Sequence, residues 1–265
     1  IEGRENIGGT WDLFKYPGIR SDSDMYTFAY SFKPWTEKEY IGSAERINNY
    51  LNELVRDENL DQYIRFQQKV TAANWDSSQN HWLVTVTRHD GSNYKIAANF
   101  LSCCSGYYNY EQGYLPKFEG YDDYQGTIAH PQHWPEDLDY SGKRVIVIGS
   151  GATAVTVVPA MAKKAAHVTM VQRSPSYIFS RPASDLLFRF LSHILPKGIT
   201  NRIMRAKYAT LQQLNFVLSK RFPDLMRKLV RTMNKKDLAG AADVDIHFKP
   251  SYKPWDQRMA LVPDA

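Results

Sequence analysis

A glycine-rich turn between an apolar strand and a helix restricts the possible folds more than any other feature of this chain. The run Arg144–Ile148 is apolar enough to be a buried strand of a parallel sheet, and the pattern after the turn predicts a helix to about Lys164. A second apolar strand is predicted over His167–Gln172, which completes a β-α-β unit. The sequence therefore predicts an α/β fold.

The turn itself matches the G-x-G-x-x-G/A pattern of dinucleotide-binding sites. Gly149 permits a tight turn, Gly151 lets a pyrophosphate approach the backbone, and Ala154 allows close packing of helix and strand. The free N–H groups and the positive dipole end at the start of the helix favour phosphates. An ordinary glycine turn is the alternative interpretation. The predicted contact residues are Gly149, Ser150, Gly151, Ala152, Thr153, Ala154 and Val155.

The end of the second predicted strand indicates which dinucleotide is bound. An NAD site carries Asp or Glu roughly 20 residues after the glycines, where it binds the ribose 2′-hydroxyl. This chain has Gln172 and Arg173 there, and a guanidinium suits a 2′-phosphate. We therefore expect NADPH to be preferred over NADH, with Gln172 and Arg173 as contacts. A solvated surface charge is the alternative role for Arg173.

The chain before the turn predicts a helix and a small antiparallel meander. Apolar residues on one face indicate a helix over Ser43–Glu58, and an apolar strand is predicted over Phe100–Gly106. After the turn, residues 185–237 are predicted helical with breaks near Pro196 and Pro223, and residues 241–265 are predicted to be loop. The meander strands are predicted over Tyr63–Ala73, His81–Thr87 and Tyr94–Leu101, the last two joined through Asp90-Gly91.

The two cysteines, Cys103 and Cys104, are adjacent and end an apolar run. Neighbours in sequence rarely form a disulfide, so a reducing compartment such as the cytoplasm is expected. No basic residue stands beside them to lower a thiol pKa, and we expect buried, inert side chains rather than a redox pair. No run approaches 18 apolar residues, so no membrane-spanning segment is predicted.

The net charge of +5 is concentrated in one segment. Residues 176–240 hold 13 Lys or Arg and 3 Asp or Glu, which gives +10, while the other 200 residues sum to −5. Apolar residues recur there at helical spacing, as in an amphipathic surface helix. Packing on the protein is the simplest role, and peripheral membrane contact through residues 185–236 is the second hypothesis. Nucleic-acid binding is not expected, because no recognised nucleic-acid module accompanies the charge.

An aromatic segment lies shortly before the glycine turn. His130 and His133 are three residues apart, but Pro131 prevents a helix and neither cysteine nor a carboxylate cluster joins them, so no metal site is predicted. The segment has the form F/Y-x-G-x-x-x-H-x-x-x-W-P, which is met by Tyr124, Gly126, His130, Trp134 and Pro135.

This segment resembles the signature of Baeyer–Villiger monooxygenases, within the larger class of flavin-containing monooxygenases. Four further segments are similar to the ethionamide-activating subgroup of FAD-containing monooxygenases, and together they make the resemblance specific. They are residues 8–14 (GGTWDLF), 16–24 (YPGIRSDSD), 104–110 (CSGYYNY) and 254–258 (PWDQR).

The resemblance implies an α/β flavoprotein with two Rossmann-like dinucleotide-binding domains, one for FAD and one for NADP, and a helical insertion. Family members begin with an FAD-binding strand and glycine motif and continue well beyond Arg258, so the chain is expected to be incomplete at both ends. The implied divisions are 1–106, the remainder of the FAD domain with the meander; 107–142, a connecting segment with the signature; 143–240, the NADP domain with the insertion 176–240; and 241–265, an active-site loop returning toward the FAD domain.

The resemblance also assigns residues to the cofactors. Glu2 would bind the FAD ribose, Val70 would present backbone to the adenine, and five residues would lie along the flavin: Gly8, Gly9, Thr10, Trp11 and Asp12. The stretch between isoalloxazine and nicotinamide would be Arg20, Ser21 and Asp22.

The residues that the resemblance implies for catalysis are Arg258, Asp22, His130 and Trp134. Arg258 matches the position that stabilises the flavin peroxide anion and the negative tetrahedral adduct, which suits a permanently charged guanidinium. Gln257 precedes it where many family members have Lys, so help from a second cation is in doubt.

The implied function is an FAD- and NADPH-dependent monooxygenase that acts through a C4a-peroxyflavin. It would convert ketones to esters or lactones and thioethers or thioamides to S-oxides, with O₂ as co-substrate. One alternative is an N- or S-oxygenating enzyme without ketone activity, against which Trp134-Pro135 argues. The other is a non-catalytic NADP-binding module, and the chain by itself is expected to hold FAD poorly.

Overall fold

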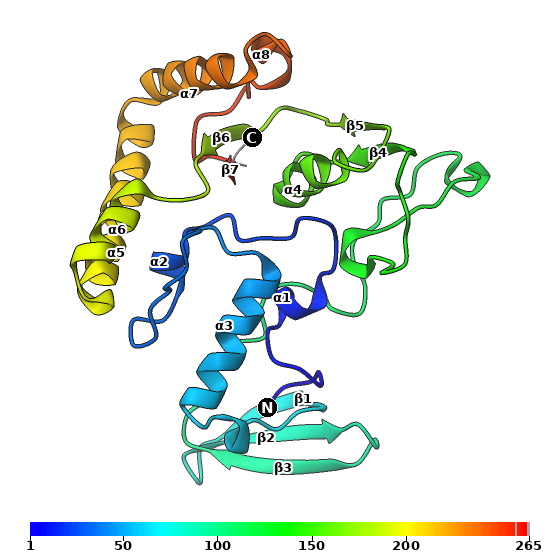
Figure 1. The fold of residues 1–265 in the computed structure, drawn as a ribbon. Helices are drawn as coiled ribbons and strands as arrows, with labels where there is room; N and C mark the ends of the chain where they lie inside the picture. Colours follow the sequence, from blue (N-terminus) through cyan, green and yellow to red (C-terminus); the bar gives the residue numbers. More distant parts are fainter. Residues whose placement is uncertain (258, 264–265) are drawn as a thin grey trace. The chain divides into compact units, whose positions relative to one another are not determined.

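The computed structural model describes residues 1–257 and 259–263, and the chain divides into two compact units. Unit 1 comprises Ile1–Phe14 and Glu45–Trp134, and unit 2 comprises Lys15–Ala44 and Pro135–Ala265. The helices and strands of both units are labelled in Figure 1.

Unit 1 is built from a long helix and a three-stranded antiparallel sheet. Helix α3 (Ala44–Asp57) buries Ile47, Tyr50 and Leu54 on one face, as its apolar spacing predicts. The meander is confirmed: β2 lies between β1 and β3, and the turn before β3 has Gly91 at φ +81°. The elements are α1 (Thr10–Leu13), η1 (Asp61–Tyr63), β1 (Gln68–Asp76), β2 (His81–Arg88), β3 (Asn93–Ala98), η2 (Tyr121–Asp123) and η3 (Pro131–His133).

Two expectations for unit 1 are wrong. The first strand begins at Gln68 rather than Tyr63, because Gln67 has a left-handed backbone with φ +54°. The segment Phe100–Gly106 is not a strand, and no neighbouring strand of the described chain pairs with it. An apolar run becomes a strand only where another strand takes up its hydrogen bonds. Both cysteines of this segment are consequently exposed, which contradicts the prediction that they are buried.

The β-α-β unit predicted from the glycine turn is present in unit 2. Strand β4 (Arg144–Ile148) and strand β5 (His167–Val171) pair in parallel, with Arg144 opposite His167 and Ile148 opposite Val171. Helix α4 (Ala152–Met161) connects them, as a parallel pair requires a crossover. The glycine turn therefore stands between the end of β4 and the start of α4.

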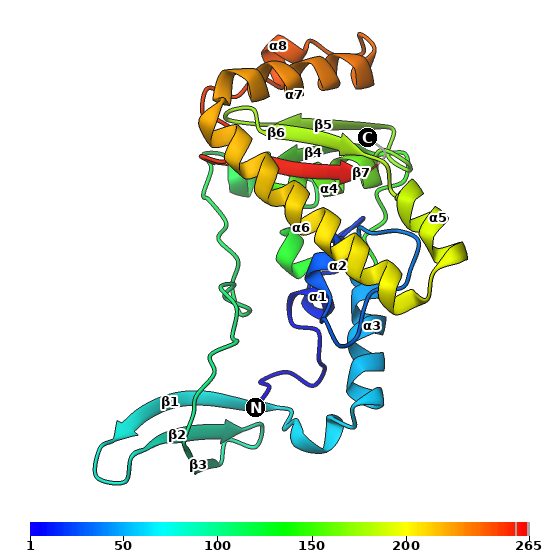
Figure 2. The same cartoon turned by 90° about the vertical axis from the view of Figure 1, so that its left-hand side faces the viewer.

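A second parallel pair corrects the prediction for the end of the chain. Strand β6 (Tyr177–Arg181) pairs with β7 (Met259–Pro263), so residues 241–265 are not only loop and residues 176–240 begin with a strand (Figure 2). The short helix α8 (Val244–His247) also lies in the predicted loop. Ala260 and Val262 of β7 pack with Val155 of α4, which explains why this short apolar run is ordered.

Three helices fill the segment between these strands, as the helical periodicity predicts. They are α5 (Leu186–Ile194), α6 (Lys197–Arg221) and α7 (Pro223–Leu238), and the breaks fall at the predicted prolines. Asp185 caps α5 by accepting hydrogen bonds from the N–H groups of Leu187 (2.8 Å) and Phe188 (3.2 Å). The same carboxylate pairs with Lys207 of α6 at 2.5 Å, which fixes α5 against α6.

Unit 2 also includes a segment near the start of the chain, Lys15–Ala44. It contains α2 (Met25–Phe28), which packs against α6 and is capped by Asp24 through the N–H of Thr27 at 2.8 Å. Among the described residues, no helix combines the length and the apolar content that crossing a bilayer requires.

Candidate functional site

The glycine turn has the geometry that the motif predicts. The N–H of Gly149 donates to the carbonyl of Val171 at 2.8 Å, and Gly149 has φ +136°, a conformation that residues with a Cβ rarely adopt. Gly151 is the N-cap of α4 and has an extended backbone with φ −82°. The first N–H groups of α4 have no partner within the helix, as at every helix start. The turn thus offers donors at the carboxyl end of β4.

Ser174 and Ser176, which follow β5, hold this turn in place, and sequence reasoning missed them. The hydroxyl of Ser176 donates to the carbonyl of Ser150 at 2.7 Å, and the hydroxyl of Ser150 donates to the carbonyl of Ser174 at 3.2 Å. Ser150 and Ser176 are both buried. Buried polar groups that bond to each other in this way fix the backbone of the turn.

A tyrosine places the segment before Arg20 against the start of α4. The buried Tyr16 side chain makes a hydrogen bond with Thr153, and burial raises the pKa of its hydroxyl above the ordinary value. Gly18 lies against α4, since a Cβ there would stand 2.7 Å from the Cβ of Ala160. The predicted residues Arg20, Ser21 and Asp22 therefore belong to the same unit as the glycine turn, next to this anchored segment.

Within that stretch, the side chains have different surroundings. Ser21 is buried, and its hydroxyl donates to the carbonyl of Ser23 at 2.9 Å while its N–H donates to Gly42 at 2.8 Å. Arg20 pairs with Ser43 in an isolated antiparallel bridge. Asp22 is exposed. Ser21 shapes the loop, and the Asp22 carboxylate is the group that a ligand can reach.

The end of β5 carries the predicted Gln172 and Arg173. Arg173 is exposed, and the side-chain N–H of Gln172 donates to the carbonyl of His247 at 3.1 Å. This bond brings the end of α8 to the end of β5, a contact that the sequence did not predict.

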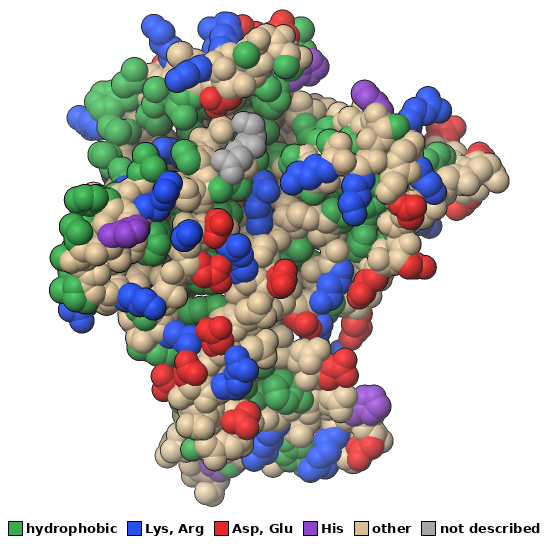
Figure 3. Space-filling model, viewed as in Figure 1, with side chains coloured by type: hydrophobic (Ala, Val, Ile, Leu, Met, Phe, Trp, Pro, Cys, Tyr) green, Lys and Arg blue, Asp and Glu red, His purple; other side chains and the backbone are tan. Residues whose placement is uncertain are grey.

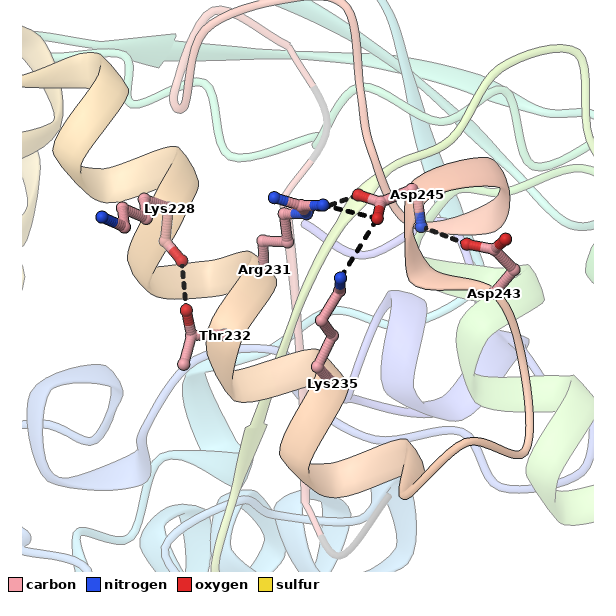
Figure 4. A network of polar contacts seen from close by, with 6 residues as sticks. All are labelled: Lys228, Arg231, Thr232, Lys235, Asp243 and Asp245. Carbon is pink, nitrogen blue, oxygen red and sulfur yellow. Dashed lines mark hydrogen bonds and ion pairs between the residues drawn. The ribbon is translucent and has the colours of Figure 1, made fainter.

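Helix α8 is fixed to α7 by a network of charges (Figure 4). Arg231 binds Asp245 through two nitrogens, and Lys235 reaches the same carboxylate at 3.1 Å. The hydrogen bond from Arg231 holds the pKa of Asp245 at about 2. Asp243 caps α8 by accepting from the N–H of Asp245 at 2.8 Å. The network thereby places His247 beside Gln172.

In unit 1, Arg4 bonds to two of the residues predicted to lie along FAD. Its guanidinium donates to the carbonyl of Gly9 at 2.8 Å and pairs with Asp12 at 2.6 Å, and both side chains of the ion pair are largely buried. The N–H of Arg4 donates to the Glu2 carboxylate at 2.9 Å. Sequence reasoning missed this role of Arg4.

The remaining residues predicted for FAD lie in the same unit. Asn48 of α3 donates to the carbonyl of Trp11 at 2.8 Å, which attaches α1 with Thr10 to α3. Gly8 packs directly against Asn48. Val70 is exposed at a bulge in β1, where the register with β2 shifts. The residue that the bulge leaves outside the ladder is the neighbouring Thr71, whereas Val70 itself is paired with Val86.

His130 of the signature segment is held from several sides. Its Nδ1 accepts a hydrogen bond from the N–H of Gln132 at 3.2 Å, so its ring proton is on Nε2. Gly113 packs against the ring, and the buried Gln132 side chain bonds to the carbonyl of Asn109. The signature segment is therefore joined to the 104–110 segment. Trp134, the residue after η3, is half-buried.

Two further expectations and one surface pocket concern the limits of the site. Arg258 lies outside the described residues. No group of three or more metal-ligating side chains occurs within residues 1–257 and 259–263. A surface pocket of about 360 Å³ contains none of the predicted contact residues, and we assign it no role in the chemistry. It is lined by Ser180, Arg181, Pro182, Met233, Lys236 and Asp237.

Comparison with protein families gives a match over most of the chain. The model of the family described as flavin-binding monooxygenase-like matches residues 15–245. A curated relative, the FAD-containing monooxygenase EthA of Mycolicibacterium smegmatis, is 50% identical over 265 residues, which is all of this chain and 54% of the relative. The chain spans about half the length of the curated relatives it matches.

Solved structures give similar matches. A cyclohexanone monooxygenase bound to ε-caprolactone has a TM-score of 0.63 at 28% identity, covering 76% of this chain and 39% of that chain. An oxidised steroid monooxygenase bound to NADP has a TM-score of 0.59 at 30% identity, covering 81% and 39%.

Proposed function

Because the chain belongs to the flavin-binding monooxygenase-like family, we propose that it forms part of an NADPH- and FAD-dependent monooxygenase that oxidises ketones and sulfur compounds. In this proposal, the β4-α4-β5 part of unit 2 binds NADPH and unit 1 contributes to the FAD site. These parts would belong to the NADP and FAD domains that the family resemblance implies.

The observation that carries the NADPH assignment is the open space at Gly151. A Cβ on this residue would meet no described atom within 4 Å, and its φ of −82° is accessible to any residue. Neither packing nor backbone conformation of the chain therefore requires glycine there. A pyrophosphate that must approach the backbone and the start of α4 does require it.

Arg173 is the residue that we assign to the 2′-phosphate. It is exposed at the end of β5, and the bonds of Gln172 to His247 and of Ser150 to Ser174 fix the chain on either side of this position. A guanidinium can donate two parallel hydrogen bonds to a phosphate, which NADH lacks at the 2′ position. NADPH is consequently the expected reductant.

For FAD, we assign the residues gathered by Arg4. Their mutual hydrogen bonds fix the backbone of Gly8, Gly9 and α1, so a ligand there meets a preformed surface. Glu2, whose carboxylate accepts from the N–H of Arg4, would bind the ribose, and Val70 would present its backbone next to the bulge. The relative at 50% identity is named as an FAD-containing monooxygenase, which supports the assignment.

The bound cofactors would supply the reduction by NADPH and the activation of O₂. The residues of the chain would position them and stabilise charge. Asp22 is an exposed carboxylate beside the segment anchored on α4, and His130 can donate from Nε2 because its Nδ1 is already occupied. Trp134 follows His130 in the signature, and Arg258 is assigned the stabilisation of negative charge.

Ketone oxidation is proposed over N- or S-oxygenation alone on two grounds. The signature ends in Trp134-Pro135, and a solved structure similar to this chain is a cyclohexanone monooxygenase bound to a lactone. A ketone accepts the inserted oxygen between the carbonyl carbon and one substituent, giving an ester or lactone. Thioethers and thioamides accept it on sulfur.

The test uses the full-length protein with NADPH, O₂ and a long-chain methyl ketone. Formation of an alkyl acetate with matching NADPH consumption is the expected result. Oxidation of a thioether without any ester would favour the N- or S-oxygenating alternative. A purified protein that binds NADPH but shows no flavin absorbance, and oxidises neither substrate after FAD is added, would favour a non-catalytic NADP-binding module.

A further inference from the structure

The helices α5 and α6 carry a long stretch of one-sided charge. Residues 186–222 contain seven Lys or Arg and no Asp or Glu. Four of these cations form neither an ion pair nor a side-chain hydrogen bond with the described residues, whereas Arg205 bonds to backbone carbonyls. The four are Arg189, Lys197, Arg202 and Arg221, and all are exposed. This part of unit 2 is therefore a strongly cationic surface.

The solvent-facing side of α6 carries a stripe of apolar side chains among polar ones. Ile199, Ile203, Leu214 and Val217 are 38–49% exposed, and their spacing places them on one side of the helix. The opposite side contains the buried residues Thr200, Asn201, Met204 and Ser219. In an ordinary surface helix the arrangement is reversed, with the apolar side buried. The stripe thus lacks a partner among the described residues.

Helix α5 extends this apolar stripe. Leu186, Phe190 and Ile194 are four residues apart and are exposed, while Phe188 is buried. We call these three residues and the four on α6 the outer face. Figure 3 shows hydrophobic side chains gathered beside Lys and Arg over the region of α5 and α6.

A neighbouring loop, attached to another side of α6, carries exposed aromatic side chains. Arg205 of α6 donates to the carbonyls of Tyr26 and Ala29 at 3.0 and 2.9 Å, which holds the end of α2 beside α6. The residues just after it are exposed, and Tyr30 and Phe32 stack with ring centroids 5.2 Å apart. Aromatic rings of this kind are common at the boundary of a bilayer.

We propose that the outer face docks on the surface of an anionic lipid bilayer. Apolar side chains on one side of a helix, flanked by cations, are the features by which a helix lies in the headgroup region. The guanidinium groups of Arg189 and Arg202 would bind lipid phosphates, and the stripe would enter the acyl boundary. The absence of acidic residues over 186–222 favours a lipid surface over the mixed charges of a protein partner.

This role is independent of the proposed oxidation, because the outer face contains no residue assigned to a cofactor. It would bring the enzyme to apolar substrates that dissolve in lipid.

The test measures co-sedimentation of the full-length protein with vesicles of phosphatidylcholine alone and of phosphatidylcholine with phosphatidylglycerol. Binding to the anionic vesicles, weakened by salt, is expected. Replacing Arg189 and Arg202 by Gln should weaken partitioning by about fivefold for each cation. The double variant Ile203→Gln/Leu214→Gln should weaken it by at least about tenfold.

The matched control is Ile246→Gln on α8. Ile246 is 65% exposed but lies on α8, outside the outer face, so its variant should bind vesicles normally. Circular dichroism should show unchanged folding for all variants, since every replaced side chain is exposed. Failure to bind anionic vesicles, or equal binding by the Ile203→Gln/Leu214→Gln variant, would overturn the proposal. If the unchanged protein were a dimer that does not bind vesicles, and the Ile203→Gln/Leu214→Gln variant were a monomer, the outer face would instead be the contact with a second copy.

Discussion

The two glycine segments of this chain, one in each unit, differ in what surrounds the glycines. At Gly151 the space that a side chain would occupy is open, and the backbone is one that any residue can adopt. At Gly8 that space is filled by Asn48, and φ is +109°. Gly151 leaves room for a ligand, whereas the packing and backbone of the chain itself require a glycine at position 8. A glycine is therefore evidence for a ligand by itself only where its own neighbours do not explain it, and the assignment of Gly8 to FAD rests on the family resemblance instead.

The strongest test of this comparison is Gly151→Val. We expect the Kd for NADPH to rise about 100-fold, because the new side chain would occupy the path of the pyrophosphate. The free energy of unfolding should change by no more than about 1 kcal/mol, the usual range for an N-cap. Fluorescence titration with NADPH and denaturant unfolding measure the two quantities. Gly198→Val is the control, since Gly198 also has open space around it but lies in α6. An unchanged Kd would remove the main support for the NADPH site.

The opposite behaviour is expected of Gly8→Ala. Here the left-handed backbone and the clash with Asn48 should lower the free energy of unfolding by about 2 kcal/mol. NADPH binding should be unaffected as long as the protein is folded. Gly3→Ala serves as the control, because no described atom lies within 4 Å of a Cβ there. If Gly8→Ala were as stable as the unchanged protein, the contrast between the two segments would disappear.

The smallest effect is expected for Arg173→Ala, which tests the contact with the ligand near the glycine turn of unit 2. The loss of a bidentate phosphate contact should weaken NADPH binding about tenfold and leave NADH binding nearly unchanged. Arg144→Ala is the charge-matched control, because Arg144 stands at the other end of the same strand pair. Equal weakening of NADH and NADPH by Arg173→Ala would show that the residue does not read the 2′-phosphate.

Local patterns predicted the elements that depend on neighbours in sequence. The apolar run before Gly149, the meander with its Asp90-Gly91 turn and the helices between Asp185 and Asp237 all have signals within a few residues. The placement of Gly149 and Gly151 between β4 and α4, and of Ala154 in the first turn of α4, followed from the same reasoning.

What could not be predicted depends on contacts between distant segments. Strand β7 is a short run after turn residues, and it is a strand because β6 and α4 cover it. The Phe100–Gly106 run has a similar composition and no such partner, so it is not a strand and its cysteines are exposed. Helical spacing placed Ile203 and Met204 together, but only packing decides that Met204 is buried while Ile203 faces solvent.

The candidate site shows the same division. The motif identified the residues that would touch a ligand, but not those that hold them. Ser176 bonds to the glycine turn from 26 positions away in sequence, and Tyr16 reaches Thr153 from a separate segment. Serine and tyrosine are common surface residues, so nothing in their immediate surroundings signals these roles.

The parallel pairing of β6 with β7 has a consequence for how unit 2 folds. The chain from residue 182 to residue 258 lies between the two strands, so their hydrogen bonds can form only after a long loop is closed. Contacts of such sequence separation slow folding, and the strand pair is expected to form late. The entropy of closing the loop, in contrast, grows only by about 0.6 kcal/mol for each doubling of its length. Natural variants can therefore lengthen or shorten the helices α5 to α7 at little cost to the strand pair beneath them.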